Sequence, residues 1–173
     1  MEAALFAAVV LEQHGYPPLV LSFESIDELD HVIFVYRHGG RWGSVARSRD
    51  PGLHGRKPVF ATPRALALSY VDPYVDLTGR VTGYAVIDLG RQMGAYDWRL
   101  ADTNVWKVER VLIEYPHRPI ASSDQRVDWL RARYRAFKKQ FPHRKPLFYR
   151  DRERWTELPR EFTSRDRNPL WAW

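Results

Sequence analysis

The chain has 173 residues, of which 45% are apolar and 14% aromatic, and this suffices for one folded domain with its own core. It contains no cysteine, which excludes disulfides, thiolate metal sites and a cysteine nucleophile within these residues. The formal net charge is +6 without long blocks of like charge, so composition alone supports nucleic-acid binding only weakly.

The first predicted element is a helix over residues 2–14, which is apolar on all sides and ends at Gly15. A helix of this kind belongs in the interior of a domain. Its apolar run is far shorter than the roughly 18 to 20 residues that cross a bilayer, and Glu2 stands where a signal peptide has basic residues. We therefore expect a cytoplasmic protein without a membrane partner.

A β-hairpin is the clearest signal that follows. After a short predicted strand over residues 19–23 and an acidic loop, residues 31–36 and 42–46 form two β-prone runs. Gly39 and Gly40 lie between them and supply the positive φ angles that a tight turn needs. The pattern predicts a hairpin.

The middle of the chain alternates between loops and short elements. Residues 48–61 are rich in glycine, proline and charge, which indicates a long loop. Thr62 as N-cap and Pro63 as first helical residue begin a helix that extends to about Val71. Three segments follow: a predicted strand over 81–89, an ambiguous stretch over 90–104 and a predicted strand over 105–115.

The last predicted helix begins at the capping box Ser122-Ser-Asp-Gln125, continues to Phe141 with apolar residues at three- and four-residue spacing, and covers the sheet. Residues 148–173 are expected to be a basic, aromatic strap or tail on a single domain over 1–147. This order of elements predicts an α+β fold in which a buried N-terminal helix packs on a mostly antiparallel sheet, with further helices on the sheet.

Motifs for metal or cofactor binding are missing from the sequence. The six histidines show no metal-ligand spacing, and there is no glycine-rich phosphate loop. We expect neither a metal nor a cofactor.

The first 50 residues carry a pattern of another kind. An apolar helix leads through Gly15-Tyr16-Pro17 to a strand, His31 opens the next strand, and Trp42 follows the turn. This arrangement resembles the core of the transglutaminase-like superfamily, and the resemblance implies a papain-like α+β fold with cysteine acyl-transfer chemistry on peptide or amide bonds.

That resemblance also implies roles for individual residues. His31 takes the place of the catalytic base, and Trp42 contributes to substrate binding. The nucleophilic cysteine corresponds to the position immediately before Met1, and the place of the orienting carboxylate is occupied by Ala46, unless Ser48 or Asp50 has taken over its role. We expect an inactive relative as the chain stands, or a cysteine acyl-transfer enzyme if a cysteine precedes Met1. A purely structural His31, bonded to Asp30 or to a backbone carbonyl, is the alternative.

A second hypothesis concerns the basic face of the last helix, which could bind nucleic acid or an acidic partner. The aromatic tail, with Trp155, Phe162, Trp171 and Trp173, could add base stacking. A solvated face without a partner is the alternative interpretation. The cations concerned are Arg126, Arg131, Arg133, Arg135, Lys138 and Lys139.

Overall fold

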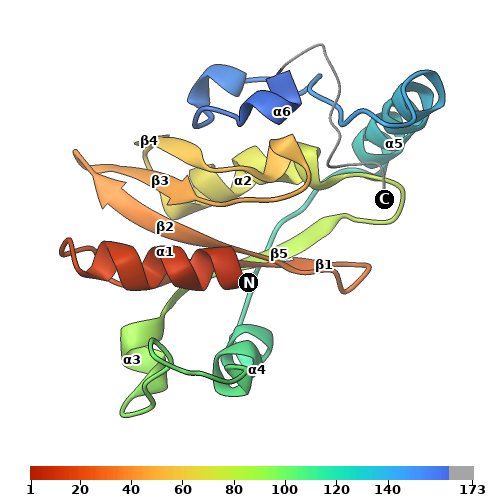
Figure 1. Cartoon of the computed structure of the whole chain (residues 1–173). Helices are drawn as coiled ribbons and strands as arrows, with labels where there is room; N and C mark the ends of the chain where they lie inside the picture. Colours follow the sequence, from red (N-terminus) through yellow and green to blue (C-terminus); the bar gives the residue numbers. More distant parts are fainter. Residues whose placement is uncertain (164–173) are drawn as a thin grey trace.

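The computed structural model describes residues 1–163, which form an α+β fold around a single antiparallel sheet (Figure 1). The strands are β1 (Leu19–Ser25), β2 (His31–His38), β3 (Arg41–Val45), β4 (Arg56–Phe60), β5 (Val81–Asp88) and β6 (Arg118–Pro119). They lie in the order β4-β3-β2-β1-β5-β6, and all neighbouring pairs are antiparallel. The predicted fold class is confirmed.

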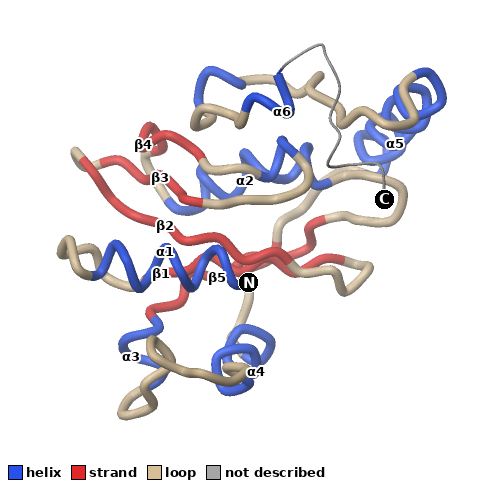
Figure 2. The backbone as a smooth tube through the Cα atoms, viewed as in Figure 1, coloured by secondary structure: helices blue, strands red, loops and turns tan. Residues whose placement is uncertain are grey.

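Helices cover both faces of this sheet, and Figure 2 shows the strands lying between the two groups of helices. One face carries α1 (Glu2–Glu12), α3 (Leu89–Met93) and α4 (Trp106–Glu114), and the other carries α2 (Pro63–Tyr74). On the same side as α2 lie α5 (Asp124–Gln140) and α6 (Arg160–Thr163). Among residues 1–163, no helix combines the length and apolar character that a membrane crossing requires.

Two predicted local features are confirmed in detail. Gly39 and Gly40 have φ angles of 54° and 77°, and they join β2 to β3 in a two-residue turn. Thr62 caps α2, because its Oγ1 accepts a hydrogen bond of 3.1 Å from the Ala65 backbone N–H, and Pro63 is the first helical residue.

The first helix is less buried than its composition suggests. Ala4, Leu5, Ala7 and Ala8 face the sheet, whereas Phe6 is 72% exposed. Helix α1 therefore covers one face of the sheet and is not wrapped on every side. Its apolar outer residues have no partner among residues 1–163 that would shield them.

Two predicted assignments are wrong. The segment 105–115 contains helix α4 (Trp106–Glu114) rather than a strand, because Val105, Val108, Leu112 and Tyr115 recur at three- and four-residue spacing and pack on one side. Residues 48–61, expected to be a loop, contain β4. This strand lies at the edge of the sheet, and β3 is its only neighbouring strand among residues 1–163. Pro58 has no backbone N–H, and it is tolerated because no second strand needs that donor.

Helix α5 was expected to cover the sheet, but it does not. Its buried residues, Val127 and Leu130, pack with Val75 just beyond the end of α2. Beyond α5, residues 148–163 run back over β4; we call this segment the C-terminal strap. Its Trp155 is 4% exposed and forms a β-bridge with Arg56, which attaches the strap to the edge strand.

Candidate functional site

His31 is the first residue of β2, and its side chain points to the face of the sheet that α2 covers. The imidazole stacks on Phe23 at 6.4 Å between ring centres and lies 6.5 Å from the ring of Tyr74. Helix α1 packs on the opposite face, so the ring of His31 is not beneath that helix. Strand β2 nevertheless starts near the amino end of α1 (Figure 1).

The surroundings of this imidazole strongly favour its neutral form. Burial lowers the pKa of His31 to about 4, and the positive charges of the Met1 amino group and Arg56 act in the same direction. A hydrogen bond to the Leu53 carbonyl and the charge of Asp50 oppose this shift. The Nε2 atom is sealed from solvent and has no hydrogen-bond partner among residues 1–163. At neutral pH His31 is therefore an uncharged ring with one unused nitrogen.

The loop between β3 and β4 brings Ser48 and Asp50 into the same region, but neither bonds to His31. The Asp50 backbone N–H donates to Ser48 Oγ at 3.1 Å, and the Asp50 carboxylate pairs with Lys145 at 2.8 Å. Ala46, which the resemblance places at the position of the carboxylate, packs against the core on the α2 side. The resemblance requires a carboxylate that orients the imidazole. Among residues 1–163 no carboxylate bonds to the His31 ring, and Asp50 acts on that ring only through its charge.

Arg56 is a neighbour that sequence reasoning missed. Arg56 is fully buried, with 0% of its surface exposed. Its guanidinium donates to the carbonyls of Gly52 (2.7 Å) and His54 (2.6 Å) and to Ser69 Oγ (3.2 Å). The guanidinium carbon lies 4.0 Å from the ring centre of Tyr70 and 4.7 Å from that of Trp155. A lone arginine in a Gly- and Pro-rich stretch gives no local signal for such burial.

Trp42 does not join this group. It pairs with Arg37 across the hairpin, six residues along β2 from His31, which corresponds to about 20 Å. Its indole is partly buried against the same core. A substrate contact made by Trp42 at His31 is therefore not supported by this geometry.

The cations of the basic helix have unequal roles. Arg126 pairs with Asp72, Arg131 donates to the Thr78 carbonyl at 2.9 Å, and Lys138 donates to the Pro142 carbonyl. Three further cations, Arg133, Arg135 and Lys139, are exposed.

The aromatic tail also differs from expectation. Trp155 is buried, and Phe162 packs edge-on against His54 at 5.1 Å, so neither ring is an open stacking surface. Trp171 and Trp173 lie outside the residues that the structure describes.

The part of the chain that the structure describes contains no group of three or more His, Asp or Glu arranged to hold a metal ion. Comparison of the sequence with models of known protein families gives no match, and a search of curated proteins gives none either. The interpretation of the site therefore rests on its own chemistry.

Proposed function

We propose that this chain carries the histidine part of a transglutaminase-like cysteine acyl-transfer site, and that it does not transfer acyl groups as it stands because it has no thiol. The observation that carries this proposal is the buried, unpartnered Nε2 of His31. Buried polar atoms almost always have a partner, and an exception calls for an explanation, of which a catalytic role is one. A second support is the charge of the Met1 amino group, which reaches the imidazole from the start of α1.

The chemistry follows from a neutral imidazole. Such a ring can take the proton of a thiol placed just before Met1, where the helix dipole of α1 would stabilise the resulting thiolate. The thiolate would attack an amide carbonyl, and the C–N bond would break as the leaving amine takes the proton from the imidazole. A thioester would remain until water or a second amine displaced the sulfur. The substrate class is a peptide or protein amide.

A restored thiol tests this proposal directly. We would place a cysteine immediately before Met1 and measure p-nitrophenolate release from p-nitrophenyl acetate, with and without His31→Gln. General-base catalysis contributes a factor of about 100 or more, so the cysteine variant should be acylated about 100 times faster than its His31→Gln counterpart. Circular dichroism would verify that both variants fold.

A third variant separates the site from thiol reactivity in general. Val105→Cys places a thiol at the start of α4, away from His31, and its acylation rate should not change when His31→Gln is added. Equal acylation rates for the Met1-proximal cysteine with and without His31 would reject the proposal. Alkylation by iodoacetamide gives a second test that does not use the ester. If the pH dependence of the alkylation rate of this cysteine is the same with and without His31, the proposal is also rejected.

A further inference from the structure

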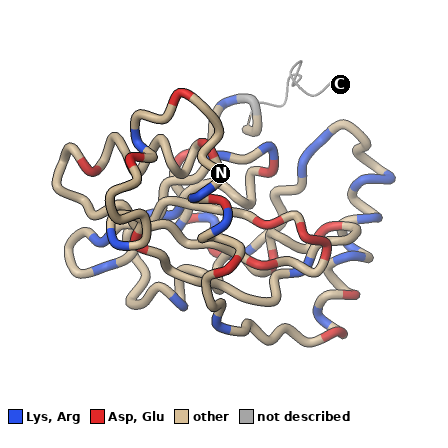
Figure 3. The backbone as a smooth tube through the Cα atoms, turned by 90° about the horizontal axis from the view of Figure 1, so that it is seen from below, with Lys and Arg blue, Asp and Glu red and all other residues tan. Residues whose placement is uncertain are grey.

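Positive charge is concentrated in one part of this molecule. Residues 124–150 contain nine Lys or Arg and two Asp, whereas the whole chain has a formal net charge of +6. The remaining residues together are therefore close to neutral. Lys and Arg recur along α5 at the right of Figure 3, so the excess charge lies on this helix and the segment that follows it.

Only some of these cations are used inside the protein. Arg126 and Lys145 pair with Asp72 and Asp50. Arg133, Arg135, Lys139 and Arg144 are exposed, and within residues 1–163 none of them has a carboxylate at ion-pair distance. Exposed cations without a carboxylate partner in this part of the chain can contact an external anion.

The outward side of α5 arranges these groups around a half-exposed indole. Trp129 is 52% exposed, and the guanidinium of Arg133, one turn later, lies 5.3 Å from its ring centre. The same guanidinium lies 4.3 Å from the ring of Phe148 and is thereby held in place. Arg135 and Lys139 are four residues apart and therefore share a face of the helix. They form the second edge of the outward side of α5, opposite the edge formed by Trp129 and Arg133.

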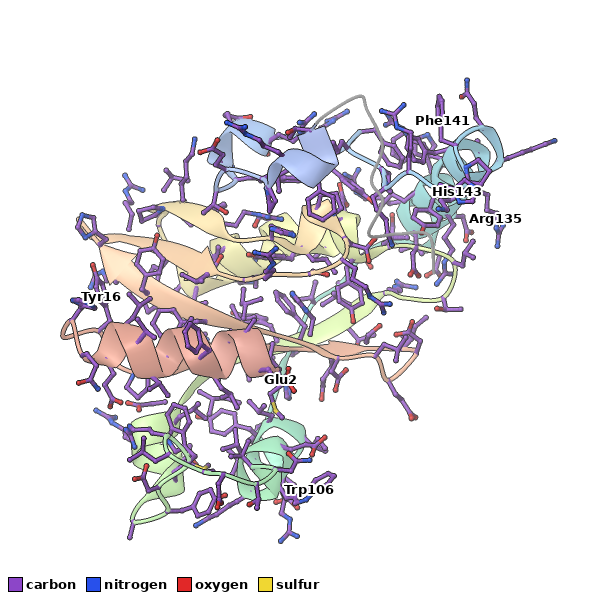
Figure 4. All side chains as sticks on the ribbon, in the orientation of Figure 1. Glu2, Tyr16, Trp106, Arg135, Phe141 and His143 are labelled. Carbon is purple, nitrogen blue, oxygen red and sulfur yellow. The ribbon has the colours of Figure 1, made fainter. Side chains whose placement is uncertain are left out.

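Figure 4 shows Arg135 at the outer end of the molecule, away from the sheet. Ala132 and Ala136 lie between the two basic edges and are exposed, and the exposed Asp128 lies on the same side of α5 as Arg135 and Lys139. We call the surface formed by Trp129, Arg133, Arg135, Lys139 and these two alanines the basic face.

We propose that the basic face binds single-stranded nucleic acid without sequence preference. Phosphates would contact the unpaired cations, and an unstacked base would lie on the indole of Trp129, as in proteins that combine basic grooves with aromatic platforms. A duplex keeps its bases stacked and cannot use Trp129 in this way.

Two other polyanionic partners fit less well. Membrane-bound helices need a continuous apolar side, but the apolar residues Val127 and Leu130 of α5 are buried against Val75. A protein interface needs an apolar centre, and Trp129 is the one large hydrophobic side chain of α5 that is exposed. This inference is independent of His31 and of the proposed acyl-transfer site.

The test is fluorescence anisotropy with a labelled single-stranded oligonucleotide of about 20 nucleotides. Four phosphate contacts predict that the Kd rises about 50-fold between about 50 mM and about 200 mM salt. Arg135→Glu with Lys139→Glu should weaken binding at least about tenfold. The charge-matched control, Arg41→Glu with Arg110→Glu, alters exposed cations elsewhere and should have a much smaller effect.

A second pair of variants tests the stacking. Trp129→Ala should raise the Kd about tenfold, because stacking of one base contributes about 1 to 3 kcal/mol. Trp106→Ala, which removes a 66% exposed indole from α4, should leave the Kd unchanged. Equal losses in the two charge-reversal pairs, or tighter binding to phosphatidylserine vesicles than to the oligonucleotide, would overturn the proposal.

Discussion

The imidazole of His31 lies between Phe23 and Tyr74, where nothing in residues 1–163 offers its Nε2 a hydrogen bond. Protonation would place a positive charge in this pocket beside Arg56 and the Met1 amino group. The ring is therefore a base that the folded state keeps neutral. Any added group that stabilised its charged form, such as a neighbouring thiolate, would change its behaviour strongly.

This environment predicts a specific dependence of stability on pH. The unfolded chain protonates His31 with a pKa of about 6.5, whereas burial lowers the pKa in the folded state to about 4. Between these values the unfolded chain binds more protons, so the free energy of unfolding falls as the pH falls from 6.5 to 4. The loss should reach about 3 kcal/mol.

Urea unfolding at several pH values measures this loss. His31→Gln removes the titrating group and should flatten the curve in this window, whereas His143→Gln, at an exposed position, should not. An unchanged slope in His31→Gln would mean that another group carries the pH dependence.

At the scale of elements, the C-terminal strap holds the loop between β3 and β4 against the candidate site. The Thr156 N–H donates to the Gly55 carbonyl at 3.1 Å, and the Lys57 ammonium donates to the Glu153 carbonyl at 2.8 Å. Trp155 covers Arg56, which in turn binds the carbonyls of the loop. The strap thus stabilises the loop whose Leu53 carbonyl bonds to His31.

Removing the aromatic anchor should release the strap. Trp155→Ala leaves a cavity beside Arg56 and should lower the free energy of unfolding by about 3 kcal/mol. Trypsin should then cleave faster after the basic residues of the strap, which gel electrophoresis with mass spectrometry would locate. Trp106→Ala serves as the control, since its exposed indole contributes little packing. Unchanged cleavage in Trp155→Ala would show that the strap does not depend on this contact.

At the scale of the whole molecule, one sheet separates two hydrophobic cores. Leu66 belongs to the core beneath α2 and Leu89 to the core shared by α1, α3 and α4, and both are fully buried. The strands between them contribute alternate residues to each core, as Phe34 and Val35 do in β2. Loss of either core removes support from the same sheet.

The two cores should therefore unfold together. Leu66→Ala and Leu89→Ala should each lower the free energy of unfolding by about 2 to 5 kcal/mol. Both variants should retain one transition that is the same by tryptophan fluorescence and by circular dichroism. Separate transitions in either variant would show that the two faces are independent units.

Sequence reasoning succeeded where a signal was short-range. The turn at Gly39 and Gly40 and the cap at Thr62 depend on φ angles and on hydrogen bonds to residues at most three positions away. It failed for α4, where an approximate alternation concealed a helical spacing, and for β4, whose Pro58 is tolerated only because the strand is at an edge. For the candidate site, it singled out His31, whose role stays a prediction, and gave no sign that Arg56 is buried beside it.

The sequence by itself determined the fold class, the hairpin, the cap at Thr62 and the absence of a thiol, because each follows from patterns of residues that are close in the chain. Only the tertiary structure decided which polar groups lose water and which keep it. Arg56 is buried by Tyr70 and by Trp155 from the far end of the chain, while Arg133 and Arg135 stay exposed on α5. Burial depends on what packs from a distance, and no local pattern of residues encodes that.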